Sequence, residues 1–246
     1  MEELSELRRL ETRAFFGFIA EHAGSDAELD RRTFHALARY TDEEYRTLSR
    51  LFLDADARAS VAFLGRDADE RAAIIEELDD EGHEIVLHGY RHVECAGLPY
   101  DLAHENLARG LDAIEDAAGV RPEGFFAPFK EVSEGTLRAA DELGLTWILG
   151  RSEADAPDGI DLFDSVFPHD TRLLGGDGTP EAAFAELTDR AAPGETFLFH
   201  PNLVEYHGAM DEFDAWTREV RPTAVGRAGP EDVGVVLDCL RPLAVE

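Results

Sequence analysis

Short apolar runs alternate along this chain with amphipathic helical stretches, and this alternation limits the possible folds more than any other feature. The apolar runs are residues 60–65, 84–88, 124–127, 146–149 and 196–200. Their apolar residues are mostly consecutive, which is typical of strands buried on both faces of a parallel sheet. Between the runs, helical spacing followed by glycine predicts helices at 69–81, 101–118 and 133–143. The alternation predicts a parallel βα fold, either an open sheet or a closed barrel.

The flanking regions predict fewer regular elements. Residues 3–21 have the apolar spacing of an amphipathic helix, and a further helix is expected at 210–220. Residues 151–180 are rich in Asp, Gly and Pro and predict a loop with one short strand near 162–167. Residues 232–240 are apolar enough to pack back on the domain.

The length of 246 residues suits one large domain, because single α/β barrels often reach about 250 residues. We therefore expect a single domain over residues 1–246, in which residues 1–30 form an N-terminal helical extension.

The charge balance is strongly acidic, with 53 Asp and Glu against 23 Lys and Arg and a net charge of −30. Lys130 is the only lysine. A dense acidic surface that repels itself is expected in a protein adapted to high salt, where the repulsion is screened; the alternative is an acidic protein with no such adaptation. Either way, the charge argues against nucleic acid and anionic membranes as partners.

Nothing in the sequence indicates a membrane or a secreted protein. It contains no run of about 18 apolar residues, and its first residues are acidic rather than basic and apolar. We therefore expect a cytoplasmic protein, in which Cys95 and Cys239 are free thiols.

Two histidines follow the second apolar run, in the segment Gly82 to His92. His88 ends the predicted strand and His92 lies four residues later, at the strand end where α/β folds carry their sites. Two neutral imidazoles here could bind one divalent zinc, nickel, cobalt or iron ion. The alternative is a pair of unrelated histidines, one capping the chain and one in solvent.

The residues around this pair resemble the polysaccharide deacetylases of the NodB-homology type. The segment GHEIVLHGYRH, residues 82–92, is similar to the family's metal-binding motif, in which both histidines bind the metal. The resemblance extends over residues 31–205. It includes the strand at 60–65, the helix at 101–119, the segment 119–150 and a late Leu-x-His motif at Leu198 and His200. It implies a distorted parallel βα barrel with an extra N-terminal helix, and one divalent transition metal per chain.

Two motifs of that family are altered here. At the position of the family's Thr-Phe-Asp-Asp motif, which supplies the catalytic base and a metal ligand, the chain reads Thr33, Phe34, His35, Ala36. The arginine that orients the base in the family falls on Phe126. Because a buried guanidinium without its carboxylate would be costly, the loss of both is coherent and indicates a rebuilt site.

The remaining candidate residues follow from the same comparison. His35 is either a third metal ligand beside His88 and His92 or a core histidine with satisfied hydrogen bonds. His200 corresponds to the family's general acid, which protonates the leaving amine; the alternative is a histidine held by the turn that follows it. Weaker candidates are Glu94 and Asp101 as a replacement base, Tyr90, Phe126 and Pro128 as substrate-binding residues, and Lys130, His169, Asp170 and His207 at the border of the cleft.

The resemblance implies a hydrolase of non-peptide carbon–nitrogen bonds, a metal-dependent enzyme that removes an N-acetyl or N-acyl group, most simply from a carbohydrate or small molecule. Two alternatives remain open. The chain could be a non-catalytic relative that binds a carbohydrate or metabolite, or a different amide hydrolase on the same scaffold.

Overall fold

The computed structural model describes residues 5–14, 40–176 and 178–239, and its centre is an 8-stranded sheet in which every paired strand is parallel. The strands are β1 (Ser60–Phe63), β2 (Glu84–Leu87), β3 (Gly124–Glu131), β4 (Trp147–Arg151), β5 (Asp161–Phe163), β6 (Thr196–Phe199), β7 (Thr223–Ala224) and β8 (Gly234–Leu237). Their order is β5-β4-β3-β2-β1-β8-β6, with β7 also paired to β8. The Val166 N–H donates to the Thr196 carbonyl oxygen at 2.8 Å, which joins the segment after β5 to the opposite end of the sheet. The sheet is therefore the curved, distorted βα barrel expected from the sequence.

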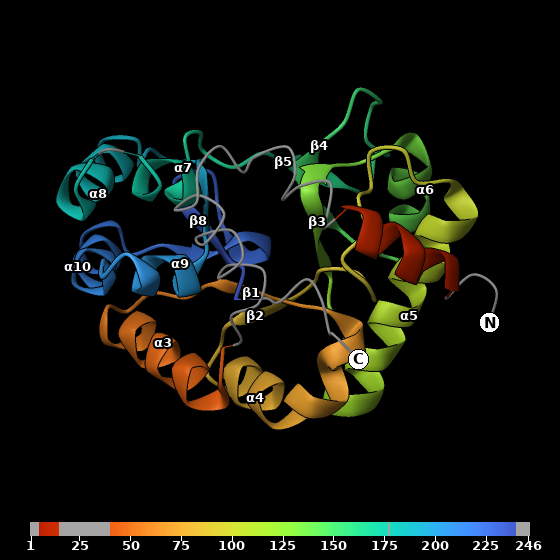
Figure 1. Cartoon of the computed structure of the whole chain (residues 1–246), viewed down its shortest axis with the longest axis horizontal. Coiled ribbons are helices and arrows are strands. Elements are labelled where there is room, and N and C mark those ends of the chain that lie inside the picture. Colours follow the sequence, from red (N-terminus) through yellow and green to blue (C-terminus); the bar gives the residue numbers. More distant parts are fainter. Residues whose placement is uncertain (1–4, 15–39, 177, 240–246) are drawn as a thin grey trace.

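Helices surround this sheet (Figure 1). They are α3 (Asp42–Asp54), α4 (Ala68–Asp80), α5 (Tyr100–Ala118), α6 (Glu134–Glu142), α7 (Asp170–Leu174), α8 (Pro180–Asp189), α9 (Pro201–Tyr206) and α10 (Met210–Val220). Residues 5–14 are also helical and are called the N-terminal helical segment below. None of the helices in the described part of the chain is long and apolar enough to cross a bilayer.

The core divides into two clusters because strand side chains alternate between the two faces of the sheet. The larger cluster joins one face of the sheet to the helices, as where Ile85 and Leu87 pack with helical residues. The smaller one, called the interior cluster below, contains no residue of an α-helix. It consists of Ala62, Val86, Phe126, Trp147, Leu149, Leu198, Val225 and Val236. The interior cluster fills the concave side of the sheet, so polar residues just beyond it lie at a rim.

The five apolar runs predicted as strands are β1, β2, β3, β4 and β6, and the three helices predicted between them are α4, α5 and α6. The helix predicted at 210–220 is α10. Residues 151–180 contain the expected short strand, β5, but also the short helix α7, which the loop prediction omitted. Residues 232–240 do more than pack on the domain, because they contain β8, which lies inside the sheet between β1 and β6.

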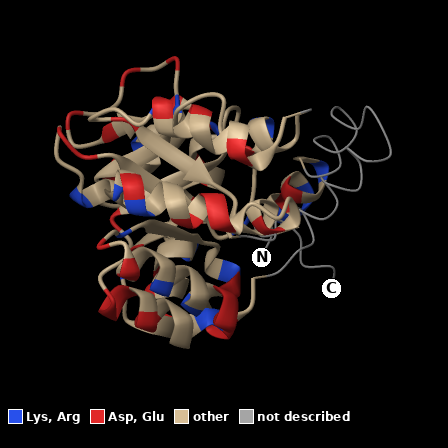
Figure 2. Cartoon of the chain, turned by 90° about the vertical axis from the view of Figure 1, so that its left-hand side faces the viewer, with Lys and Arg blue, Asp and Glu red and all other residues tan. Residues whose placement is uncertain are grey.

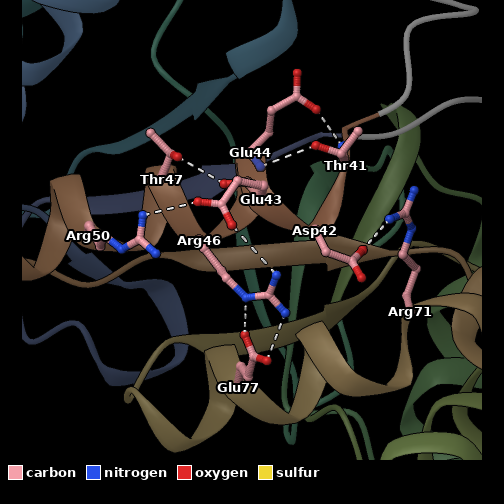
Figure 3. Close-up of polar contacts among 9 residues, drawn as sticks. All are labelled: Thr41, Asp42, Glu43, Glu44, Arg46, Thr47, Arg50, Arg71 and Glu77. Carbon is pink, nitrogen blue, oxygen red and sulfur yellow. Dashed lines mark hydrogen bonds and ion pairs between the residues drawn. The ribbon is translucent and has the colours of Figure 1, made fainter.

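Helix α3 illustrates how acidic side chains are used at the surface (Figure 3). It begins at a capping box, in which the Glu44 N–H donates to Thr41 Oγ1 at 3.3 Å and the Thr41 N–H donates to Glu44 Oε2 at 2.5 Å. The ion pairs that link α3 to α4 are Arg46 with Glu77 at 2.6 Å and Asp42 with Arg71 at 2.5 Å. Solvent screens such surface pairs and leaves them little effect on stability, so they align the two helices more than they stabilise the fold.

Acidic residues are spread over helices and loops in the view of Figure 2, with fewer basic residues between them. The net charge of −30 therefore acts as general repulsion across the surface. We predict that the melting temperature rises as KCl is raised from 0.1 M to 2 M. Most of the rise should occur below about 1 M, because the Debye length falls from about 10 Å at 0.1 M to about 3 Å at 1 M. Thermal melts followed by circular dichroism test this, and a flat or falling melting temperature would exclude salt adaptation.

Candidate active site

Three chemically active side chains lie one layer beyond the interior cluster, at the carboxyl ends of their strands. The residue two positions after an interior side chain faces the same side of the sheet. The pairs are Val86 and His88, Leu198 and His200, and Val236 and Asp238. Since the strands are parallel, all three side chains meet at one rim, where sites of this fold class occur. All three are buried.

One ring nitrogen of His88 is hydrogen-bonded to the backbone, and the other is available to a ligand. Its Nδ1 donates to the Phe126 carbonyl oxygen at 2.7 Å, so Nε2 keeps its lone pair. Among the described residues the buried Nε2 has no hydrogen-bond partner. Burial lowers the pKa of His88, and the nearby Asp238 carboxylate offsets part of that effect. The ring is therefore neutral, and its hydrogen bonding is that of a metal-binding histidine.

His92 lies beside His88, with 4.8 Å between the ring centroids. The N-terminal helical segment holds its backbone, because the His92 N–H donates to Oε1 of Glu11 at 3.0 Å. The Glu11 carboxylate also accepts hydrogen bonds from Arg66 at 2.7 Å and from Arg91 at 3.0 Å. The Glu11 side chain is only 2% exposed. A buried carboxylate with two arginines thus fixes the loop that carries His92.

His200 is held by a fully buried carboxylate at the start of α7. Its Nδ1 lies 3.0 Å from Asp170 Oδ1, and its backbone N–H donates to Asp170 Oδ2 at 2.5 Å. With Nδ1 committed in this way, Nε2 is the nitrogen turned to the site, 3.6 Å from Asp238 Oδ2. Asp170 therefore fixes both the tautomer and the orientation of His200.

The charges at the rim set the protonation states of this group. Burial alone would lower the pKa of His200, but the Asp170 carboxylate and then Asp238 raise that pKa above the ordinary value of imidazole. Burial alone would raise the pKa of Asp170, but its charge interaction and hydrogen bonds with His200 lower it. The pair therefore favours an aspartate beside an imidazolium, and the imidazolium can donate a proton from Nε2. Burial lowers the pKa of the neighbouring His169 to about 4, so that ring is neutral.

The wall beside His92 has an unusual backbone. Phe129 and Lys130 have φ values of 62° and 60°, the left-handed region that non-glycine residues seldom adopt. The Phe129 ring packs edge-on against His92, with 5.0 Å between centroids. Lys130 Nζ donates to Ser165 Oγ at 2.6 Å, so this bulge of β3 is tied to the segment after β5.

The described residues provide some, but not all, of the ligands that a divalent metal site needs. The unpaired, neutral Nε2 of His88 and the adjacent ring of His92 supply the nitrogen donors that zinc, cobalt and nickel accept. Within residues 5–14, 40–176 and 178–239, no group of three or more His, Cys, Asp or Glu side chains is arranged around a common metal position. The two histidines thus form half of a site, and His35, the predicted third ligand, lies outside the described residues.

The other predicted residues take varied positions around this centre. Phe126 belongs to the interior cluster and stacks on His88, with 4.4 Å between centroids, while its carbonyl fixes that ring. Pro128 is buried and Tyr90 is half-buried in the loop after β2. Glu94 and Asp101 are exposed. Cys95 and Cys239 are buried free thiols.

Asp238 and Glu11 belong to the site but were not identified from the sequence. Asp238 follows the short apolar run 235–237, and this strand-end position was the available signal. No local signal marks Glu11, since its partner His92 is 81 residues away along the chain. Asp170 was noted only as a border residue, and its bond to His200 makes it central.

Comparison with known proteins relates residues 33–148 to the polysaccharide deacetylase family, whose profile matches that range. A curated relative, the peptidoglycan deacetylase-like protein FGM2 of Gibberella zeae, is 33% identical over 91 residues, which is 37% of this chain and 26% of that protein. The chain thus matches about a quarter of the length of this relative.

Solved structures show the same fold. A protein from Mycobacterium smegmatis assigned to the polysaccharide deacetylases has a TM-score of 0.61 at 24% identity, over 94% of this chain and 82% of that one. A family 4 carbohydrate esterase pseudoenzyme from Bacillus anthracis has a TM-score of 0.56 at 16% identity, over 80% and 60%. A family 4 acetyl xylan esterase from Clostridium thermocellum, solved with a cobalt ion, has a TM-score of 0.54 at 20% identity, over 80% and 83%. The sequence profile over residues 33–148, the relatives and the fold all relate this chain to the polysaccharide deacetylases.

Proposed function

We propose that this protein is a metal-dependent hydrolase that removes an N-acetyl group from a carbohydrate. The observation that carries the proposal is that His200, held by the buried Asp170, lies at the same rim as His88, whose Nε2 has no hydrogen-bond partner among the described residues. Metal-assisted hydrolysis of an amide needs a proton donor for the leaving nitrogen and a metal that polarises the carbonyl, and these residues could supply both.

Each residue has a separate task in this proposal. His88 and His92 would hold the metal, with His35 as the candidate third ligand. A divalent metal bound there would polarise the acyl carbonyl and lower the pKa of a bound water. His200 donates its Nε2 proton to the nitrogen that leaves, and Asp170 keeps that proton on Nε2 by accepting the one on Nδ1. The Phe126 carbonyl keeps the His88 lone pair directed into the site.

Two exposed aromatic residues support a carbohydrate substrate. Phe167 is 60% exposed and Tyr206 is 45% exposed, and they are the large apolar side chains most open to solvent in the described part of the chain. Phe167 contacts the His169 ring, which lies 6.4 Å from the His200 ring between centroids. Flat apolar faces of this kind suit the apolar face of a sugar ring. The cytoplasmic location expected from the sequence stays a prediction.

The proposal predicts that replacing His88 and His92 together by alanine abolishes both metal binding and acetate release. The assay is release of acetate from N-acetylglucosamine oligomers with added Co²⁺, together with elemental analysis of the purified protein. His104→Ala is the matched control, because this histidine on α5 packs against Tyr100 and has no part in the proposed site. Equal metal in the parent and the double variant, or a parent that releases no acetate with zinc, cobalt or nickel, would rule the proposal out.

The altered first motif favours one alternative, a protein that binds a carbohydrate without hydrolysing it. Ala36 cannot supply the carboxylate that the family carries there, and a structural relative is itself a pseudoenzyme. In that case the same oligomers would bind, as measured by calorimetry, while acetate release would stay at the level of the buffer.

A further inference from the structure

Strand β8 brings a carboxylate to the centre of the rim from the last part of the chain. It pairs in parallel with β1 on one side and with β6 on the other. In the β6 register, Phe199 is opposite Leu237, so the next residues, His200 and Asp238, are neighbours across the two strands. The backbone confirms this, because the Asp238 N–H donates to the Phe199 carbonyl oxygen at 2.9 Å.

The Asp238 side chain is directed at the reactive groups rather than at solvent. Its Oδ2 lies 3.6 Å from His200 Nε2, the nitrogen that carries the transferable proton, and the side chain is 8% exposed. It also acts electrostatically on His88. Asp238 thus lies between the proposed acid and the proposed metal ligand, and no group of three metal-binding side chains forms around it within the described residues. This position suits a base better than a ligand.

We propose that Asp238 is the general base of the hydrolysis and replaces, from the last strand, the carboxylate that the chain lacks at Ala36. This inference rests on the proposed deacetylase function. The Asp238 carboxylate takes one proton from water while the water oxygen forms a bond to the acyl carbon. The carbon–nitrogen bond then breaks, and the leaving nitrogen takes the Nε2 proton of His200. The products are a carboxylic acid and an amine.

The separation of 3.6 Å also accounts for how the site returns to its starting state. After one turnover Asp238 is protonated and His200 is neutral. Transfer of that proton from Asp238 to Nε2 restores the carboxylate and the imidazolium without help from solvent. The base and the acid therefore act as one connected pair.

The test replaces Asp238 by asparagine, which keeps the shape and removes the base. We expect kcat for acetate release to fall by about 10²–10⁴-fold, while KM and the affinity for Co²⁺, measured by equilibrium dialysis, stay within about threefold of the parent. The pKa of His200, followed by NMR of its ring, should fall because a facing carboxylate is lost. Asp161→Asn is the control, because Asp161 is an exposed carboxylate at the start of β5, the opposite end of a strand.

Each other outcome overturns the inference in a recognisable way. A His200 pKa that is unchanged in Asp238→Asn would show that the two side chains do not face each other. A kcat within about threefold of the parent would leave the deacetylase in place but remove Asp238 as its base. A loss of Co²⁺ affinity of about 10-fold or more would make Asp238 a ligand instead. Failure of the proposed function is distinct, since the parent protein itself would then release no acetate.

Discussion

Replacing Asp170 by asparagine is expected to lower kcat for acetate release by roughly 10²-fold or more, the scale of losing an oriented acid. Asp170 accepts two hydrogen bonds from His200, one from Nδ1 and one from the backbone. An asparagine side chain offers one oxygen and one NH₂ group, so one of these donors would face another donor. His200 would also lose the negative charge that raises its pKa.

The pH profile separates this effect from simple misfolding. His200 has a raised pKa in the parent protein, so activity that needs its proton should persist through neutral pH. In Asp170→Asn the basic limb of kcat/KM should move to lower pH, and part of the activity should return on acidification. A basic limb at the same pH in both proteins would contradict the assigned role of Asp170.

The same variant should lose stability within a defined pH window. The lowered pKa of Asp170 stabilises the fold above the unfolded value of about 3.9, and this contribution is lost as the pH falls through the folded pKa. The raised pKa of His200 stabilises the fold below about 6.5, and that contribution is lost as the pH rises through the folded pKa. The difference in unfolding free energy between parent and variant should therefore be largest between about pH 4 and 6.5. Urea melts across the pH range measure it.

Replacing Glu11 by alanine is expected to lower the free energy of unfolding by about 3–5 kcal/mol, the usual cost of breaking a buried ion pair from one side. Arg66, with a side chain 8% exposed, would lose its closest carboxylate and keep only the longer contact to Asp67 at 3.6 Å, and the His92 N–H would lose its acceptor. Because His92 would then be free to turn away from His88, the affinity for Co²⁺ should fall by about 10-fold or more.

Two variants make this prediction specific. Glu6→Ala removes a carboxylate of the same helix that pairs with Arg9 at the surface, and it should leave the stability close to that of the parent because such pairs are screened by solvent. Glu11→Gln keeps an oxygen for the His92 N–H and should recover most of the Co²⁺ affinity, while Arg66 and Arg91 still lose the negative charge of Glu11. If Glu11→Ala binds Co²⁺ as tightly as the parent, the N-terminal helical segment has no part in positioning His92.

The sequence predicted the elements whose signal is local. Consecutive apolar residues, such as Ile85 to Leu87, predict a strand buried on both faces. Gly119, which has a φ of 68° in the structure, predicts the end of α5. Strand β8 was harder to predict, because a run of three apolar residues does not reveal that it lies between β1 and β6. Pairing between distant strands depends on the closed sheet, not on local periodicity.

The residues of the candidate site also fall into those with a local sequence signal and those that only the fold brings together. His88 and His200 could be predicted because each directly follows a buried strand. Their protonation states could not, because these depend on Phe126, Asp170 and Asp238, which only the fold brings close. The single-domain expectation for residues 1–246 stays a prediction, as do the roles of His35 and of the substrate-binding residues.

Lys130 gives the molecule a built-in chemical probe. It is the only lysine in the sequence, it is 9% exposed, and its ammonium group ties the β3 bulge to Ser165. Burial lowers its pKa, and Asp164 offsets part of that effect, so the amine is reactive once reagent can reach it. An amine-selective label therefore has one side-chain target, at the wall beside His92. Its rate of modification reports how often that wall opens, so substrate or metal that closes the rim would be detected as protection of one residue.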